Sequence, residues 1–148
     1  MSKSSKTWEY YAQNEPYWSV LTFEEYTKKN LNDKQLKKFF ETGEKHIQKV
    51  FQIIEEVHLE NFKPSLSLDY GCGVGRNLIP LSNLSNQVIG VDVSSTMLKE
   101  AQINSKTLGS NNIRLMQASE FLDDKSISYD FLHSFIVLQH IEKKEGLK

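Results

Sequence analysis

The spacing of apolar positions along the chain changes near residue 64, and this change separates two groups of predicted elements. From residue 32 to residue 57, apolar side chains recur at intervals of three and four positions, which predicts one long amphipathic helix. Asn32 is a suitable N-cap, with Gln35 three positions later, and Gly43 interrupts the pattern. The apolar stripe consists of Leu36, Phe39, Phe40, Ile47, Val50, Phe51, Ile54 and Val57.

Beyond Pro64, short apolar runs alternate with short helical patterns. Strands are predicted over residues 66–70, 87–93 and 113–116 and within 129–138, and helices over 78–84 and from Ser94 or Ser95 to Gly109. Because parallel strands are joined by helical crossovers, this alternation predicts an α/β fold with a doubly wound, Rossmann-like parallel sheet.

Residues 1–60 contain helical patterns but no strand pattern, so we expect a helical N-terminal extension there and a sheet-bearing core over 61–148. An aromatic-rich segment begins near Tyr10, and Pro16 breaks any long helix in it. Two interpretations stay open: a structural cover on the sheet, or a lid over a ligand. As a lid, it would offer Tyr11, Tyr17 and Trp18 as pocket residues.

The fourth predicted strand lies close to the end of the sequence at Lys148. A parallel strand that is buried on both faces is not normally left as an open edge of a sheet. We therefore expect a sheet truncated after about the fourth strand, whose edge is covered by a missing C-terminal half or by a partner chain.

The charge balance argues against several classes of partner. The 148 residues include 18 basic and 19 acidic ones, with a net charge of -1, and no long basic patch, so neither nucleic acid nor a membrane is an expected partner. No apolar run is long enough to span a bilayer, and no spacing of His, Cys and acids resembles a metal site. The single cysteine, Cys72, excludes an internal disulfide and suits the cytoplasm, where we expect this protein.

The most informative segment runs from Leu68 to Arg76 and contains Gly71, Gly73 and Gly75 between a predicted strand and a helix. Glycine permits positive φ and close approach of a ligand, and ligands bind at the carboxyl ends of such strands. A dinucleotide site spaces its glycines as G-x-G-x-x-G and seats a pyrophosphate. Here the glycines alternate, and Asp69 would repel a pyrophosphate but attract a cationic amine. The charge therefore favours a phosphate-free cationic ligand.

Asp92 ends the next predicted strand, about twenty residues after the first glycine, where a carboxylate accepts hydrogen bonds from ribose hydroxyls. Dinucleotide sites and other nucleoside sites share this feature. It therefore supports an adenosine-containing ligand without choosing between the two classes.

These residues together resemble the class I S-adenosylmethionine-dependent methyltransferases. The family's acid-x-G-x-G-x-G loop is matched by Asp69 and the three glycines, its ribose-binding acid by Asp92, and its fourth-strand motif by residues 129–141. The similarity covers residues 64–141. It implies S-adenosyl-L-methionine as cofactor and transfer of its methyl group, by in-line displacement, to an unidentified small-molecule acceptor.

The resemblance also implies roles for single residues. Asp69 would face the amino group of the donor, Asp92 would bind the ribose diol, Val93 and Met97 would pack near the adenine, and Ser134 would lie beneath the methyl donor. The family usually places an acid after the third strand to contact the adenine amine. In this chain Ala118 stands there, followed by Ser119 and Glu120 as possible substitutes.

Three further side chains have open interpretations. His140 is a candidate general base toward an acceptor hydroxyl, with a structural role as the alternative. His46 and His58 are expected on the surface of the N-terminal helix, and Arg76 is either solvated or able to reach a carboxylate. Two other functions remain open, an NAD(P)-dependent oxidoreductase and an inactive fragment that binds S-adenosylmethionine without turnover.

Overall fold

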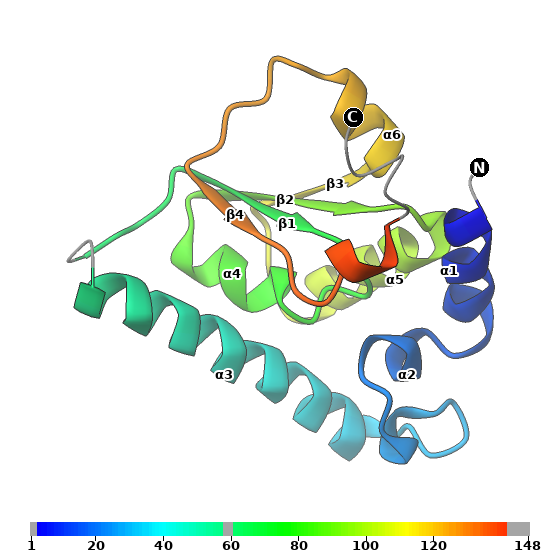
Figure 1. Cartoon of the computed structure of the whole chain (residues 1–148). Helices are drawn as coiled ribbons and strands as arrows, with labels where there is room; N and C mark the ends of the chain where they lie inside the picture. Colours follow the sequence, from blue (N-terminus) through cyan, green and yellow to red (C-terminus); the bar gives the residue numbers. More distant parts are fainter. Residues whose placement is uncertain (1–2, 58–60, 142–148) are drawn as a thin grey trace.

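A four-stranded parallel sheet forms the centre of the computed structural model, which describes residues 3–57 and 61–141 (Figure 1). The strands are β1 (Leu66–Tyr70), β2 (Gln87–Asp92), β3 (Ile113–Gln117) and β4 (Phe131–His133). Their order is β3-β2-β1-β4, and every neighbouring pair is parallel. The predicted doubly wound α/β fold is confirmed. The strand order reverses between β1 and β4, and ligands bind at such a point in open parallel sheets.

The helices cover the sheet unevenly. They are α1 (Lys3–Asn14), α2 (Pro16–Val20), η1 (Glu24–Tyr26), α3 (Asp33–Val57), α4 (Leu78–Leu84), α5 (Ser95–Thr107), α6 (Ala118–Asp123) and η2 (Leu138–His140). The helices α3, α4 and α5 lie on one side of the sheet and α6 on the other (Figure 1). Asn32 caps α3 as predicted, because its Oδ1 accepts hydrogen bonds from the backbone N–H groups of Lys34 and Gln35. Within the described residues, no helix is both long and apolar enough to cross a membrane.

The N-terminal helices share their hydrophobic core with the sheet. One buried cluster joins Tyr17 and Phe39 to Val74 and Met97, which belong to the glycine loop and α5. A second cluster combines Ile47, Phe51, Cys72, Leu78, Leu81 and Val88. Both clusters draw on residues from each side of position 60, so the N-terminal helices are packed into the core.

Helix α1 is fixed to the start of α5 through Glu9. Its carboxylate accepts hydrogen bonds from the Ser94 hydroxyl at 2.7 Å, from the Thr96 backbone N–H at 3.4 Å and from the Thr96 hydroxyl. Burial acts to raise the pKa of Glu9, but the hydrogen bonds from Thr96 and Ser94 outweigh it and lower that pKa. The carboxylate also meets the positive end of the α5 dipole. Ser94 itself caps α5 by accepting from the Met97 N–H, as predicted.

Gly43 marks the place where α3 passes closest to the glycine loop. A Cβ at this position would lie 1.9 Å from the carbonyl oxygen of Arg76 and 3.0 Å from its Cγ. Glycine inside a helix costs roughly 1 kcal/mol relative to alanine. The close backbone approach explains why glycine is needed here despite that cost.

We expect Gly43→Ala to destabilise the protein by about 1–3 kcal/mol, because the added methyl group forces α3 away from the backbone of Arg76. The free energy of unfolding in urea measures this effect. Lys45→Ala, at an exposed position of the same helix, is the matched control and should stay within about 0.5 kcal/mol of the wild type. Stabilisation by Gly43→Ala, as at an exposed helix position, would contradict the close contact.

Candidate functional site

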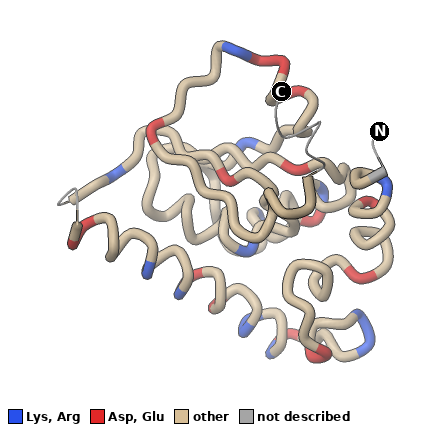
Figure 2. Tube along the Cα trace, in the orientation of Figure 1, with Lys and Arg blue, Asp and Glu red and all other residues tan. Residues whose placement is uncertain are grey.

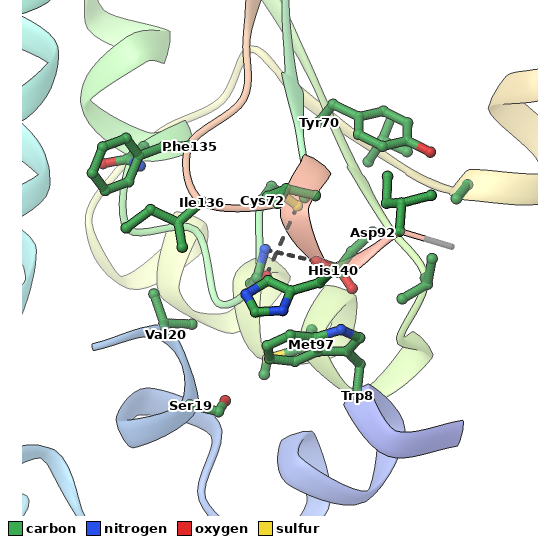
Figure 3. Close-up of a pocket in the computed structure, with 18 of the residues that line it drawn as sticks. Trp8, Ser19, Val20, Tyr70, Cys72, Asp92, Met97, Phe135, Ile136 and His140 are labelled. Atoms are coloured by element: carbon green, nitrogen blue, oxygen red, sulfur yellow. Dashed lines mark hydrogen bonds between the residues drawn. The ribbon is translucent and has the colours of Figure 1, made fainter. Parts of the chain in front are cut away.

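A cavity of about 150 Å³ opens at the carboxyl ends of β1 and β2 (Figure 3). This volume is room for an organic group rather than for an isolated water molecule. The glycine loop forms part of its lining, together with residues from α1, from α5 and from the segment that follows β4. Of the residues predicted for a ligand site, those that line the cavity are Gly71, Gly73, Asp92, Val93, Met97, Ala118 and His140. Asp69, Gly75, Ser119 and Ser134 are not among the lining residues.

The glycine loop adopts a backbone that requires glycine. Gly71, Gly73 and Gly75 have φ values of 81°, 53° and 93°, in the left-handed region that side chains disfavour. The backbone N–H groups of Gly71 and Cys72 both donate to the carbonyl oxygen of Val91, at 2.7 and 2.9 Å. The loop is therefore hydrogen-bonded to the end of β2.

The segment after β4 closes over the loop at Gly71. A Cβ on Gly71 would lie 2.3 Å from Cγ2 of Val137. Only glycine at position 71 therefore leaves room for the Val137 side chain. Ile136 has a φ of 58°, which a β-branched residue rarely adopts. Gly71 and Val137 both line the cavity.

Asp92 joins the loop to the cavity wall. One carboxylate oxygen accepts from the backbone N–H of Gly73 and the other from that of Ser94, both at 2.9 Å. Burial raises the pKa of Asp92, although the backbone N–H groups of Ser94, Gly73 and Val93 act to lower it. The backbone donors do not use all the lone pairs of the carboxylate, so Asp92 can also accept a hydrogen bond from a ligand.

Asp69 is directed away from the cavity, into a buried chain of hydrogen bonds. It is 2% exposed, and its Oδ1 lies 2.7 Å from Nδ1 of His133, its neighbour in the register of β1 and β4. His133 Nε2 in turn lies 3.0 Å from Nε2 of His46 on α3. Because a carboxylate only accepts, Nδ1 of His133 donates to it, which leaves Nε2 of His133 to accept from Nε2 of His46.

The hydrogen bond to His133 corrects the expectation that His46 is a surface residue. Its side chain is half-buried between His133 and the ring of Phe135, whose centroid lies 4.4 Å from that of His46. Burial lowers the pKa of His46, and His133 and Arg76 lower it further. The other predicted surface histidine, His58, lies outside the described residues.

The residues proposed near the adenine and the methyl group have different surroundings. Ala118 is buried on the cavity wall, whereas Ser119 is exposed on α6. Glu120 completes a capping box by accepting from the Gln117 backbone N–H, and it does not line the cavity. The Ser134 hydroxyl donates to the carbonyl oxygen of Tyr70 and so ties the end of β4 to β1.

Contacts between the two ends of the chain form another wall. The ring of Trp8 meets that of His140 edge-on, with centroids 5.1 Å apart (Figure 3). The Ser4 hydroxyl donates to the carbonyl oxygen of His140, which lies 136 positions away. The lid interpretation named Tyr11, Tyr17 and Trp18, but the residues of this region that line the cavity are Ser4, Trp8, Ser19 and Val20. No periodicity or motif in the sequence indicates the contacts of Ser4 and Trp8 with His140.

Arg76 is buried instead of solvated. It is 5% exposed, lines the cavity, and donates from Nη1 to the Thr42 hydroxyl at 3.3 Å. Cys72 is buried, and burial raises the pKa of its thiol well above the ordinary value. Over the ranges 3–57 and 61–141, no group of three or more His, Cys, Asp or Glu side chains is placed to hold a metal ion.

The part of the chain that carries the sheet matches a known protein family. Residues 68–148 match the family described as methyltransferase domain. This span is more than half of the chain and contains the last three residues of β1, the glycine loop, β2, β3 and β4.

Two curated relatives are similar over shorter segments. The chain is 39% identical over 59 residues to a 23S rRNA (uracil(1939)-C(5))-methyltransferase of Haemophilus ducreyi, covering 38% of this chain and 13% of that protein. It is 28% identical over 74 residues to a ubiquinone biosynthesis O-methyltransferase of Chelativorans sp., covering 50% of this chain and 29% of that protein. The chain thus spans less than a third of the length of these relatives.

A solved structure supports the fold over nearly the whole chain. The phosphoethanolamine N-methyltransferase 1 of Haemonchus contortus, in complex with phosphoethanolamine and S-adenosylhomocysteine, superposes with a TM-score of 0.68 at 16% identity. The match covers 96% of this chain and 27% of that one. It therefore includes the N-terminal helices as well as the sheet.

We expect the protein to lose stability as the pH falls below about 6.5, the ordinary pKa of histidine. Because the pKa of His46 is lowered in the fold, the unfolded chain binds a proton in a range where the folded protein does not. This contribution is present above pH 6.5 and is lost as the pH falls toward the lowered pKa. Urea unfolding of the wild type and His46→Gln, from about pH 8 to about pH 5, measures it. The exposed His140→Gln is the control, and identical pH profiles for wild type and His46→Gln would contradict the assignment.

Proposed function

Because the chain belongs to the methyltransferase-domain family, we propose that it transfers the methyl group of S-adenosyl-L-methionine to a small-molecule acceptor. The observation that carries this proposal is the hydrogen bond from Gly73 to Asp92, which sets a carboxylate beside the glycine backbone on one cavity wall. A carboxylate in this place accepts well from the hydroxyls of a ribose.

The lining residues suggest how the donor lies. The ribose would bind Asp92, and the adenine would lie among Val93, Met97 and Ala118, which provide apolar contact. The methionine end would follow the backbone of Gly71 and Gly73. S-adenosylmethionine supplies the methyl carbon and a sulfonium leaving group.

The predicted residues outside the cavity lining would support this site from behind it. Gly75 shapes the loop, and Asp69 and Ser134 hold β1 to β4. Under this proposal Asp69 contributes a nearby negative charge that favours a cationic donor. Ser119 would have to reach the adenine from the exposed side of α6.

Several features favour a small acceptor. Charges of both signs are distributed along α3 and around the sheet (Figure 2). A nucleic-acid site would need a basic stripe. The ubiquinone biosynthesis relative is an O-methyltransferase, whereas the rRNA methyltransferase matches only 38% of this chain. The N-terminal helices, through Ser4 and Trp8, would cover the site while an acceptor is bound.

His140 is the proposed general base for a hydroxyl acceptor. It lines the cavity, and its ring is held against Trp8. The bound donor would supply its methyl group to the acceptor oxygen, with the sulfonium leaving as a neutral thioether. His140 would take the proton of the acceptor hydroxyl.

We expect Asp92→Asn to bind S-adenosylhomocysteine at least roughly tenfold more weakly than the wild type, because the ribose loses a charged acceptor. Isothermal titration measures this, with Asp123→Asn, an exposed acid at the end of α6, as matched control. The wild type should bind neither NAD nor NADP. Equal affinity in Asp92→Asn would remove the ribose assignment, and tight dinucleotide binding would favour an oxidoreductase.

With an acceptor found by screening small phenols, carboxylic acids and amines, His140→Gln should lower kcat by about 10²–10⁴-fold for hydroxyl acceptors. The affinity for S-adenosylhomocysteine should not change, which separates proton transfer from donor binding. An unchanged kcat would assign His140 a structural role. Donor binding without turnover of any acceptor would favour the inactive fragment.

A further inference from the structure

A chain of hydrogen bonds runs from the buried Asp69 carboxylate on β1 through two histidine rings to α3. Oδ1 of Asp69 lies 2.7 Å from Nδ1 of His133 on β4, and Nε2 of His133 lies 3.0 Å from Nε2 of His46. Asp69 is 2% exposed and His133 is 6% exposed, whereas His46 is half-buried. Oδ2 of Asp69 is buried and has no hydrogen-bond partner among the described residues. The net charge at this place therefore depends on the two rings, which we call the histidine pair.

The carboxylate fixes where the protons of the histidine pair lie. Because a carboxylate only accepts, the proton in the first contact is on Nδ1 of His133, and a neutral His133 has no proton on Nε2. The proton in the second contact is then on Nε2 of His46, and Nδ1 of a neutral His46 carries none. This Nδ1 is the one ring nitrogen of the pair outside the chain of hydrogen bonds, so an added proton enters there.

A proton taken from solvent can pass along the pair toward Asp69. Nδ1 of His46 gains the proton, the N–H bond at Nε2 of His46 breaks, and an N–H bond forms at Nε2 of His133. His46 is then neutral again, and the positive charge is on His133, which contacts the carboxylate directly. The carboxylate and the pair are negative overall before this step and neutral after it.

The groups that face His46 oppose this uptake at neutral pH. Burial lowers the pKa of His46, His133 from β4 and Arg76 from the glycine loop lower it further, and Asp69 from β1 acts in the opposite direction. The ring of Phe135, from the segment after β4, packs against His46 and carries no charge. The pair is therefore neutral at neutral pH and takes up a proton below about 6.5, the ordinary pKa of histidine.

The charge of Asp69 acts on the wall of the cavity. Burial is the main cause of the raised pKa of Cys72 and of Asp92, and the negative charge of Asp69 raises both values further. Cys72 and Asp92 both line the cavity. A positive group bound there is stabilised while the histidine pair is neutral, and it loses this stabilisation when His133 is charged.

We propose that His133 and His46 are positioning residues that set the net charge behind the glycine loop, and so make the preference for the charged donor over its neutral product depend on pH. The inference rests on the proposed function, because S-adenosylmethionine carries a positive sulfur and S-adenosylhomocysteine does not. While the pair is neutral, the negative charge of Asp69 favours the donor. When His133 is charged this preference decreases, and the product competes more strongly for the site.

The two ligands share the adenosine and the amino-acid group, so the ratio of their dissociation constants isolates the charge of the sulfur. Isothermal titration measures this ratio for the wild type at about pH 8 and at about pH 5.5, on either side of the ordinary histidine pKa. We expect the preference for the donor to fall roughly three- to tenfold between the two. His133→Asn should keep the ratio found at high pH throughout, because its amide can donate to Asp69 but takes up no proton. Glu44→Gln, at an exposed position of α3, is the matched control and should show the full fall.

His140 is the competing explanation for such a pH effect, because it is a further histidine on the cavity wall. It is still present in His133→Asn. A full fall of the ratio in that variant assigns the effect to His140 and overturns the inference, as does a wild-type ratio that is independent of pH. A wild type that binds neither ligand refutes the proposed function itself.

A second measurement needs no variant and decides the matter if His133→Asn does not fold by circular dichroism. Nitrogen-15 NMR of the histidine rings of the wild type reports which nitrogen carries each proton. At about pH 8, where histidine is ordinarily neutral, His133 should carry its proton on Nδ1 and His46 on Nε2. The pair should take up its proton at the same pH at which the affinity ratio falls. A neutral His133 with its proton on Nε2, or two midpoints that differ by more than roughly one pH unit, overturns the inference.

Discussion

The hydrogen bonds between the glycine loop and the end of β2 are the constraint on which the rest of the site depends. The loop leaves β1 with three residues at positive φ, a conformation that costs entropy and has few side-chain contacts to stabilise it. The Val91 carbonyl oxygen and the Asp92 carboxylate hold it by accepting from three successive backbone N–H groups, those of Gly71, Cys72 and Gly73. The way the loop is held therefore places both its glycine backbone and the Asp92 carboxylate on the wall of the cavity.

The N-terminal helices act on this loop from outside the sheet. Helix α3 touches the loop backbone at Arg76, where Gly43 leaves room, and it brings His46 to the β1–β4 pair. Helix α1 is held at the start of α5 by Glu9 and carries Trp8 to His140. The cavity is therefore assembled from three parts of the chain that are far apart in sequence.

The charged groups around the loop differ in how they are compensated. Asp92 accepts backbone hydrogen bonds, whereas Asp69 accepts from His133 through one oxygen and has no partner at the other. The Arg76 guanidinium donates to the Thr42 hydroxyl and lies over the ring of Phe135. In a medium of low dielectric constant this difference matters, because an uncompensated buried charge gains more from a bound counter-ion than a compensated one.

The sequence by itself determined the parts of this protein that depend on residues within a few positions of one another. The spans of β1 to β3 and of α3 to α5 follow from apolar periodicity, the Asn32 and Ser94 caps from local hydrogen bonding, and the positive-φ loop from its three glycines. Tertiary structure decided which way side chains face. Asp69 and Asp92 both stand at or near a strand end, yet register pairs Asp69 with His133 while Asp92 lines the cavity. His46, Trp8 and Arg76 gained their contacts from partners many positions away, and spacing along a chain carries no record of such contacts.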